Sequence, residues 1–239
     1  MKNLLLGLVT IGLLFACGSE SEDTTSGATT PANEPNTNPG DTTPSDSNAN
    51  AVCAALADES AWTELSTTIE EDTTFTCDRV YVLSGLTFVT NGATLTVEAG
   101  TTILGGEGSA LVVTQDARIV TNGTAEAPVV MTSVNAVTPN DRAAGDWGGL
   151  ILLGNAPTSA ATPKNIEGIS GYTYGGSDPA DSSGTLQYVR VWHGGAVVGA
   201  DNEINGITFG GVGAGTIVDH CEVAFNLDDG FEWFGGTVN

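Results

Sequence analysis

Basic side chains are the scarcest feature of this sequence. Its 239 residues include six Lys and Arg against 29 Asp and Glu, and the formal net charge at pH 7 is -23. A surface of that sign repels nucleic-acid phosphates and anionic lipid headgroups, so we expect no nucleic-acid partner. The same charge suits divalent cations, and it also suits solubility outside the cell.

The sequence also lacks an apolar run of the roughly 20 residues that a membrane-spanning helix needs. The run from Leu4 to Phe15 follows Lys2 and precedes Ala16-Cys17, which is the order of a secretory signal. Leu14-Phe15-Ala16-Cys17 resembles a bacterial lipobox, whose cysteine becomes the lipidated first residue of the mature protein. We predict a signal peptide over 1–16 and a lipid on Cys17 that holds the protein at a membrane. Plain secretion with an unmodified Cys17 is the alternative.

Large apolar residues are missing from the segment that follows. Between positions 18 and 50, Ser, Thr, Asn, Pro, Gly and acidic residues dominate, and no aliphatic or aromatic side chain is larger than that of Ala. Such a segment cannot bury enough surface to offset the entropy lost on ordering. We therefore predict a disordered tether over 17–50. Position 18, directly after the predicted lipidated cysteine, is Gly rather than Asp. This resembles a sorting signal for the outer membrane of a bacterial envelope.

Cysteine is rare, and no Cys-x-x-Cys pair or Cys/His spacing indicates zinc. If Cys17 carries lipid, three cysteines remain. Cys53 and Cys77 flank a short segment, so we expect a disulfide between them in an oxidising compartment, with Cys221 as a buried thiol. We predict that residues 51–78 form an N-terminal cap closed by this bridge, with Trp62 in its core.

Short strands are abundant by contrast. Between Ala93 and Ser133, apolar stretches of three to five residues are separated by turns that contain Gly, Asn-Gly or Pro. These stretches are too short for ordinary hairpins and suit a chain wound into flat coils, each strand stacking on its equivalent one coil later. We predict an all-β solenoid over 79–239, with a β-propeller or sandwich as the alternative.

Internal similarity supports the solenoid. Residues 184–191 resemble 215–223, and 204–211 resemble 229–236 at a spacing of 25. The apolar run Leu150 to Leu153 predicts a strand buried on both faces. Residues 156–184 form a long excursion, and long loops on rigid coils often carry binding sites.

Five motifs carry a family resemblance. They are Thr-Val-Glu-Ala-Gly-Thr-Thr-Ile at 96–103, Ala-Pro-Val-Val-Met-Thr-Ser at 127–133, Asp-Trp-Gly-Gly-Leu-Ile-Leu-Leu-Gly at 146–154, Asn-Glu-Ile-Asn-Gly-Ile-Thr at 202–208 and Asp-Asp-Gly-Phe-Glu-Trp-Phe-Gly-Gly-Thr-Val-Asn at 228–239. In this order they resemble a family of bacterial envelope lipoproteins, some of them labelled multidrug transporters. The resemblance implies a right-handed parallel β-helix with a pectate-lyase-like fold and no settled activity. Family members continue with more coils, so we expect this chain to be truncated at its C-terminus.

Acidic residues near the C-terminus are the candidate catalytic groups. Asp228, Asp229 and Glu232 follow a predicted strand, and Arg190 is the strand-borne base nearest to them in sequence. Carboxylates and a base could cleave a polysaccharide by hydrolysis or elimination. The Gly-His-Gly and Arg-x-Lys signatures of β-helix pectin enzymes are absent, so we favour acids on a solvated turn. Strand alternation would place Asp219 with Cys221 and Val223 on one face, and His220 with Glu222 on the other.

Calcium is the candidate cofactor. The order Asp201-x-Glu203-x-Asn205-Gly206 imitates half of an EF-hand loop, but the twelfth position is Val212 and the flanks are predicted strands. A different calcium site could use Asp201, Glu203, Asp228 and Asp229. Ordinary turn chemistry is the alternative explanation of these residues.

Aromatic residues are the candidate ligand platforms. We expect Trp192, Tyr172 and Tyr174 to stack on sugar rings, whereas Phe209, Phe225, Phe231 and Trp233 are expected inside the coil, and His193 in a turn. The sequence favours a non-catalytic surface module that binds a glycan or another envelope protein, or plays a structural role. A polysaccharide lyase or glycoside hydrolase is the alternative.

Overall fold

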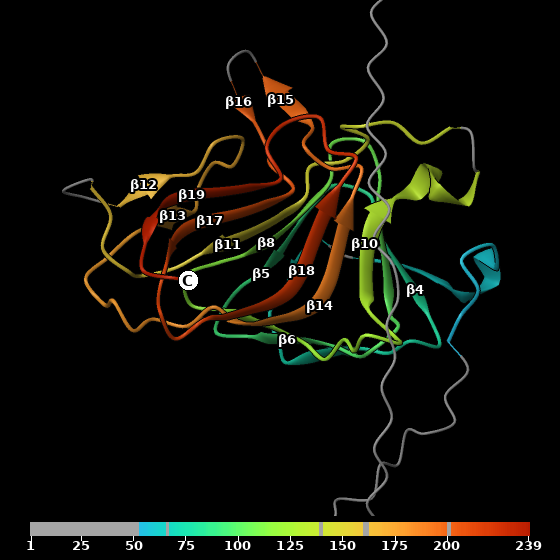
Figure 1. Ribbon diagram of the computed structural model, residues 1–239, viewed down its shortest axis with the longest axis horizontal. Coiled ribbons are helices and arrows are strands. Elements are labelled where there is room, and N and C mark those ends of the chain that lie inside the picture. Colours follow the sequence, from blue (N-terminus) through green and yellow to red (C-terminus); the bar gives the residue numbers. More distant parts are fainter. Residues whose placement is uncertain (1–52, 66, 139–140, 160–162, 200–201) are drawn as a thin grey trace, which may run out of the picture. The chain divides into compact units, whose positions relative to one another are not determined.

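The structure is a computed structural model that describes residues 53–65, 67–138, 141–159, 163–199 and 202–239 (Figure 1). Contacts divide the chain into two units, Met1–Asp46 and Ser47–Asn239, and every described residue belongs to the second. The predicted signal peptide, Cys17 and the tether lie outside the described residues. Within the described part, no helix is long and apolar enough to cross a membrane.

The described chain winds into a right-handed parallel β-helix, which confirms the predicted fold class. Strands from successive coils stack in three columns, and every ladder within a column is parallel. The first column contains β1 (Trp62–Glu64), β4 (Val80–Leu83), β7 (Thr102–Gly105) and β10 (Val129–Ser133). The second contains β2 (Thr68–Ile69), β5 (Leu86–Val89), β8 (Ala110–Val113), β11 (Leu150–Leu153), β17 (Ile207–Val212) and β19 (Phe231–Gly236). The third contains β3 (Thr73–Phe75), β6 (Thr94–Val97) and β9 (Arg118–Thr121).

Two long strands join the first and third columns into one nine-stranded sheet. β14 (Gly184–Trp192) begins beside β9, where Gly184 pairs with Ile119, and ends beside β10, where Val191 pairs with Met131. β18 (Ile217–Ala224) then pairs with β14 on both sides of one unpaired position (Figure 1). Two short antiparallel hairpins, β12 (Lys164–Asn165) with β13 (Thr173–Tyr174) and β15 (Val197–Gly199) with β16 (Asn202–Glu203), lie outside these columns.

Alternating side chains from all three columns fill the inside of the coil. Strands such as β6 and β5 show the pattern of a half-buried strand, with every second residue fully buried. The principal core runs through the coils and includes Val97, Ile103, Leu111, Ile119, Met131, Leu152, Val191 and Phe209. Trp147, which precedes β11, is fully buried in the same core.

The register of the last two coils differs by one residue from the predicted alignment. Ile207 pairs with Phe231, a separation of 24 residues, and Phe209 pairs with Trp233. A shift of one residue exchanges the two faces of a strand, so this register decides which side chains point inward. It places Phe231 against the core, as predicted, and stacks Trp233 on Phe209 with ring centres 5.6 Å apart. Trp233 is nevertheless 56% exposed, so the prediction that it lies inside the coil is wrong.

The excursion after β11 covers the outer face of the second column. Ile166, Ile169 and Tyr174 pack there against a face that includes Ile151 and Leu153. All four residues of β11 are consequently buried, which confirms the strand buried on both faces. Tyr174 is only 7% exposed, and Tyr172 stacks on Phe88 at 4.6 Å, so these tyrosines serve as a cover for the sheet. The predicted ligand-stacking role does not fit the buried Tyr174.

The β-helix begins earlier than the sequence suggested. β1, β2 and β3 already form a complete first coil within the segment 51–78 that was expected to be only a cap, because each pairs with its equivalent in the next coil. The residues before β1 form a single 3-10 turn, η1 (Glu59–Ala61), and a disulfide joins Cys53 to Cys77. Ala54 and Leu56 pack with Trp62 on the outer face of the first column, over Val80, Val82 and Leu104.

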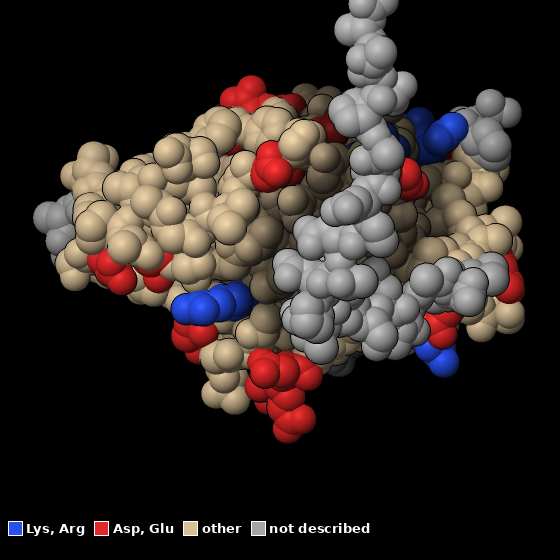
Figure 2. Space-filling view, turned by 60° about the horizontal axis from the view of Figure 1, so that its bottom comes forward, with Lys and Arg blue, Asp and Glu red and all other residues tan. Residues whose placement is uncertain are grey.

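The charge of the described surface is unevenly distributed. In the view of Figure 2, Lys and Arg side chains are few and lie apart, whereas Asp and Glu occur in small groups. A positive side chain is therefore a local exception on this protein, and Arg190 is one such exception.

Candidate functional site

β14 and β18 share an irregular backbone position, and the candidate site lies around it. Tyr188 (φ 47°) and His220 (φ 52°) both adopt the left-handed backbone conformation, and the ladder pairs the residues before and after them but not the two themselves. The left-handed residue reverses the alternation, so two consecutive side chains face outward on each strand, while the register between the two strands stays the same on both sides. A bulky residue in this conformation costs about 1–3 kcal/mol, and such positions concentrate at functional sites.

The cause of the irregularity lies in the neighbouring coil. In that coil β9 and β10 are separate strands joined by a turn, and Gly123 of the turn lies against Tyr188. A Cβ at position 123 would come within 2.5 Å of the Tyr188 carbonyl oxygen. β14 therefore turns the same corner within one strand, through its left-handed residue.

This irregularity corrects the predicted faces of β18. Asp219 was expected to share a face with Cys221 and Val223, but those two pack against the core. The Asp219 side chain is 47% exposed, and its Oδ1 lies 2.7 Å from Nδ1 of His220. The simple alternation is wrong here because the left-handed backbone of His220 reverses the faces of the residues on its two sides.

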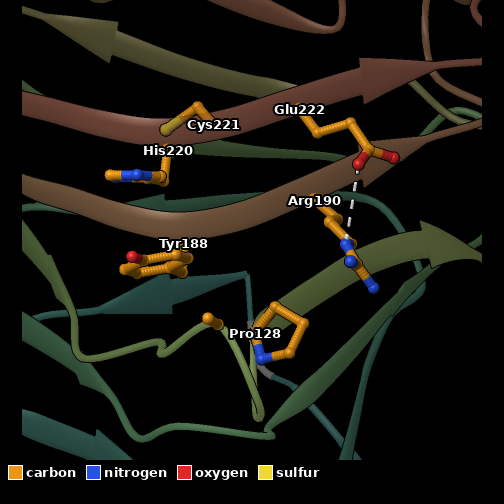
Figure 3. A pocket seen from close by; sticks show the side chains of 7 residues that line it. Pro128, Tyr188, Arg190, His220, Cys221 and Glu222 are labelled. Atoms are coloured by element: carbon orange, nitrogen blue, oxygen red, sulfur yellow. Dashed lines mark ion pairs between the residues drawn. The ribbon is translucent and has the colours of Figure 1, made fainter. Parts of the chain in front are cut away.

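Outward side chains of this region line a hollow of about 350 Å³ (Figure 3). The hollow is lined by Ala125, Pro128, Tyr188, Arg190, His220, Cys221 and Glu222. On one side the rings of Tyr188 and His220 stack with centres 4.3 Å apart and planes 15° from parallel. On the other side Arg190 and Glu222 form an ion pair, with Nε 3.7 Å from Oε2.

Glu222 connects this ion pair to Trp192. The indole Nε1 of Trp192 donates a hydrogen bond of 2.8 Å to Oε1 of Glu222. The Arg190 guanidinium lies over the same indole, with its carbon 5.7 Å from the ring centre, a contact worth about 0.5–1 kcal/mol at an exposed site. Phe225 meets the Trp192 ring edge-on at 6.4 Å and is 67% exposed, so the prediction that it lies inside the coil is wrong. Trp192, Arg190 and Glu222 thus form one preorganised group on the outer face of β14 and β18.

Cys221 borders the hollow without being suited to react there. It carries a free thiol, and burial raises its pKa, so the thiol form dominates at neutral pH. The thiolate is the nucleophilic form of cysteine. Cys221 therefore contributes packing to this site. It is half-buried, whereas the sequence suggested a buried thiol.

His193 lies at the end of β14, next to Trp192. The sequence suggested a turn residue, and the backbone is indeed left-handed (φ 61°), but the side chain is only 6% exposed. Its Nδ1 lies 3.0 Å from the Thr132 hydroxyl, and its ring stacks on Phe225 at 5.2 Å. Burial lowers the pKa of His193, the positive charge of Arg142 lowers it further, and Asp146 opposes both effects.

This lowered pKa predicts a loss of stability in mild acid. The unfolded chain binds a proton at His193 near the ordinary pKa of about 6.5, whereas the folded chain resists it. The stabilisation is therefore complete above that pH and is lost as the pH falls below it. His193→Asn keeps a residue that tolerates the left-handed backbone and removes the titration.

Urea unfolding at several pH values between 8 and 5.5 measures this effect. The stability advantage of wild type over His193→Asn should shrink as the pH falls, since carboxylates titrate alike in both proteins. Parallel pH profiles for the two proteins would show that His193 does not titrate differently on folding.

Of the acidic residues predicted as catalytic, Glu232 lies on a different sheet from Arg190, and Asp228 and Asp229 lie in the loop between β18 and β19. Glu232 belongs to β19 and accepts a hydrogen bond from Asn205. Burial raises the pKa of Glu232, and the negative charges of Glu167, Asp229 and Asp228 raise it further. These acids are thus grouped, but Arg190 on β14 is paired with Glu222 instead. The structure does not assemble the predicted set of Asp228, Asp229, Glu232 and Arg190.

A calcium site does not emerge from the described residues either. Asp201 lies outside them, and Glu203 belongs to the β15–β16 hairpin, where it pairs with Val197. In the part of the chain that the structure describes, no three His, Cys, Asp or Glu side chains are grouped so that they could hold a metal ion.

Sequence reasoning identified Trp192 and Arg190 but missed Tyr188, His220 and Glu222 as members of one site. Their equivalent positions in successive coils could have identified them. Once 184–191 and 215–223 are recognised as successive coils, a Tyr and a His occupy equivalent places, and Arg190 faces Glu222. Stacked coils bring equivalent residues into contact, so such pairs can be sought directly in aligned repeats.

Comparison with known proteins adds a family to this geometry. The model of a family described as the pectate-lyase like beta helix domain matches residues 67–239. No curated protein and no solved structure matches the chain. The match covers the coils from β2 onward and the whole candidate site.

Proposed function

Since the chain belongs to the pectate-lyase-like β-helix domain family, we propose that it is a non-catalytic module that binds a glycan on the outer face of β14 and β18. The observation that carries the proposal is the group formed by Trp192, Arg190 and Glu222 beside the stacked rings of Tyr188 and His220. Ligand sites combine apolar and aromatic surface with a few fixed polar groups. A sugar presents both kinds of surface, namely C–H faces and hydroxyl groups.

The position of the group favours binding over chemistry. Trp192 and Arg190 belong to a strand paired on both sides, which makes the platform rigid and lowers the entropy lost on binding. Cleavage by Asp228, Asp229 and Glu232 is the weaker candidate, because Arg190 lies on the other sheet and its partner Glu222 is also bonded to Trp192.

The proposal includes the location that the sequence suggests. A signal peptide over 1–16, a lipid on Cys17 and a tether over 17–50 would hold the β-helix at a bacterial outer membrane. From there the outer face of β14 and β18 could meet an extracellular polysaccharide or the glycan of another envelope component. Palmitate labelling of wild type but not of Cys17→Ser would support this part of the proposal.

Replacing Trp192 tests the binding function. Trp192→Ala removes the indole and releases Glu222, so retention on an insoluble glycan that binds wild type should weaken about tenfold, the effect of losing a central contact. Retention is measured by depletion from solution over a panel of insoluble polysaccharides. Trp233→Ala is the matched control, because this tryptophan is 56% exposed but lies on the other sheet.

Two results would contradict the proposed function. The first is wild-type protein that is retained on no member of the panel. The second is a folded Trp192→Ala protein that is retained as well as wild type, which would move the binding surface away from β14 and β18.

A further inference from the structure

The charges around the hollow are already balanced before any ligand arrives. Of the seven residues that line it, Arg190 alone is a Lys or Arg, and its guanidinium is paired with Glu222. Asp219 adds a negative charge beside His220, at 2.7 Å from the imidazole. The described residues that line the hollow therefore offer no unmatched Lys or Arg, and the chain as a whole carries a net charge of -23.

A carboxylated ligand would bind to this arrangement less favourably than an uncharged one. Its carboxylate would have to share Arg190 with Glu222, and two carboxylates beside one guanidinium repel each other. The ligand would not readily displace Glu222, because the hydrogen bond from Trp192 holds the Glu222 carboxylate in place. The net negative charge of the chain acts in the same direction and is screened only beyond about 8 Å at physiological salt.

An uncharged sugar meets complementary groups instead. Each hydroxyl can donate and accept, while Arg190 keeps N–H donors beyond the one facing Glu222, and Glu222 keeps acceptor lone pairs. The pair is fixed by Trp192 and borders the stacked rings of Tyr188 and His220. A sugar bound there would gain hydrogen bonds and aromatic contact without separating the two charges.

We infer that the hollow selects uncharged glycans and discriminates against carboxylated ones, with the Arg190–Glu222 pair as the determinant of this specificity. The inference rests on the proposed function and adds the ligand class to it. It assigns to Glu222 a role in specificity: the residue neutralises Arg190 and so denies that cation to acidic sugars. This use of a repulsive group is a common source of binding specificity.

Matched polymers that share a backbone, one of each pair carboxymethylated, test the inference. Affinity electrophoresis of the full chain would compare hydroxyethyl cellulose with carboxymethyl cellulose, and dextran with carboxymethyl dextran. We expect wild type to bind the uncharged member of at least one pair about tenfold more tightly, a factor that one unfavourable charge contact supplies. Glu222→Gln leaves Arg190 unmatched and should narrow or reverse that preference. Arg190→Gln removes the cation and should keep the preference for the uncharged polymer.

The possible outcomes distinguish a failure of the inferred ligand class from a failure of the proposed glycan binding. Tighter binding of a carboxymethyl polymer by wild type would overturn the inferred ligand class while leaving glycan binding intact. An unchanged preference in Glu222→Gln, with its melting temperature equal to that of wild type, would overturn the assignment to this ion pair. No binding to either member of any pair, nor to the insoluble panel, would overturn the proposed function itself.

Discussion

Replacing Trp147 by alanine is expected to lower the free energy of unfolding by about 3–5 kcal/mol, the range for truncating a large buried aromatic residue. Trp147 is fully buried, and the backbone of Gly105 lies directly on its ring, where an added Cβ would come within 2.5 Å of the indole carbons. Its Nε1 also donates a hydrogen bond of 2.8 Å to the carbonyl of Trp192. The variant would leave both a cavity and an unpaired carbonyl.

Urea unfolding followed by circular dichroism measures this loss. Trp233→Ala serves as the control of equal chemistry, because that side chain is 56% exposed and should cost less than half as much. Equal losses in the two variants would contradict the view that Trp147 anchors the core at this corner of the coil.

The second large effect is expected for Gly184→Ala, which should be destabilised by more than about 4 kcal/mol or fail to accumulate as soluble protein. Gly184 has φ 114°, a conformation that L residues rarely adopt, and its backbone approaches that of Ile119 in the preceding coil. A Cβ there would overlap the Ile119 carbonyl oxygen. Because Gly184 pairs with Ile119, relief of the overlap requires β14 to separate from β9.

Gly85→Ala is the matched control for this glycine. An added Cβ at position 85 would meet nothing within 4 Å, and its φ is not positive. The substitution should change stability by no more than about 1 kcal/mol, and in the stabilising direction if the unfolded chain loses entropy. Soluble yield and urea midpoints compare the two variants. A Gly184→Ala protein as stable as Gly85→Ala would contradict the close approach of β14 to β9.

The sequence was sufficient to predict the coils because short strands between small-residue turns are a local signal. It also predicted the burial of β11 on both faces, since Leu150 to Leu153 leave no polar side for water. It could not predict which element covers the outer face, because that depends on where the excursion after β11 returns. Tyr174 was therefore expected to meet a ligand, whereas it packs in the covering layer.

The candidate site was harder to predict because its geometry depends on a single backbone conformation. Alternation assumes an unbroken period of two, and one left-handed residue in each of β14 and β18 reverses it. The reason for that residue lies in another coil, at the turn that contains Gly123. No pattern within β18 distinguishes His220 from a regular strand residue, so Asp219 was placed on the wrong face. The register of β19 was missed for a related reason, since repeated glycines permit alignments one residue apart.

The continuous course of β14 has a consequence for the way this β-helix can open. In a solenoid each coil contacts only its neighbours, so local unfolding can stop at the boundary between two coils. β14 removes one such boundary, because it completes one coil beside β9 and starts the next beside β10 without a turn. The two coils that share β14 therefore form a single cooperative unit, and a fluctuation that frees one must also free the other. Trp192 and Arg190 of the proposed binding surface lie on that unit, so local unfolding of either coil would disrupt the surface.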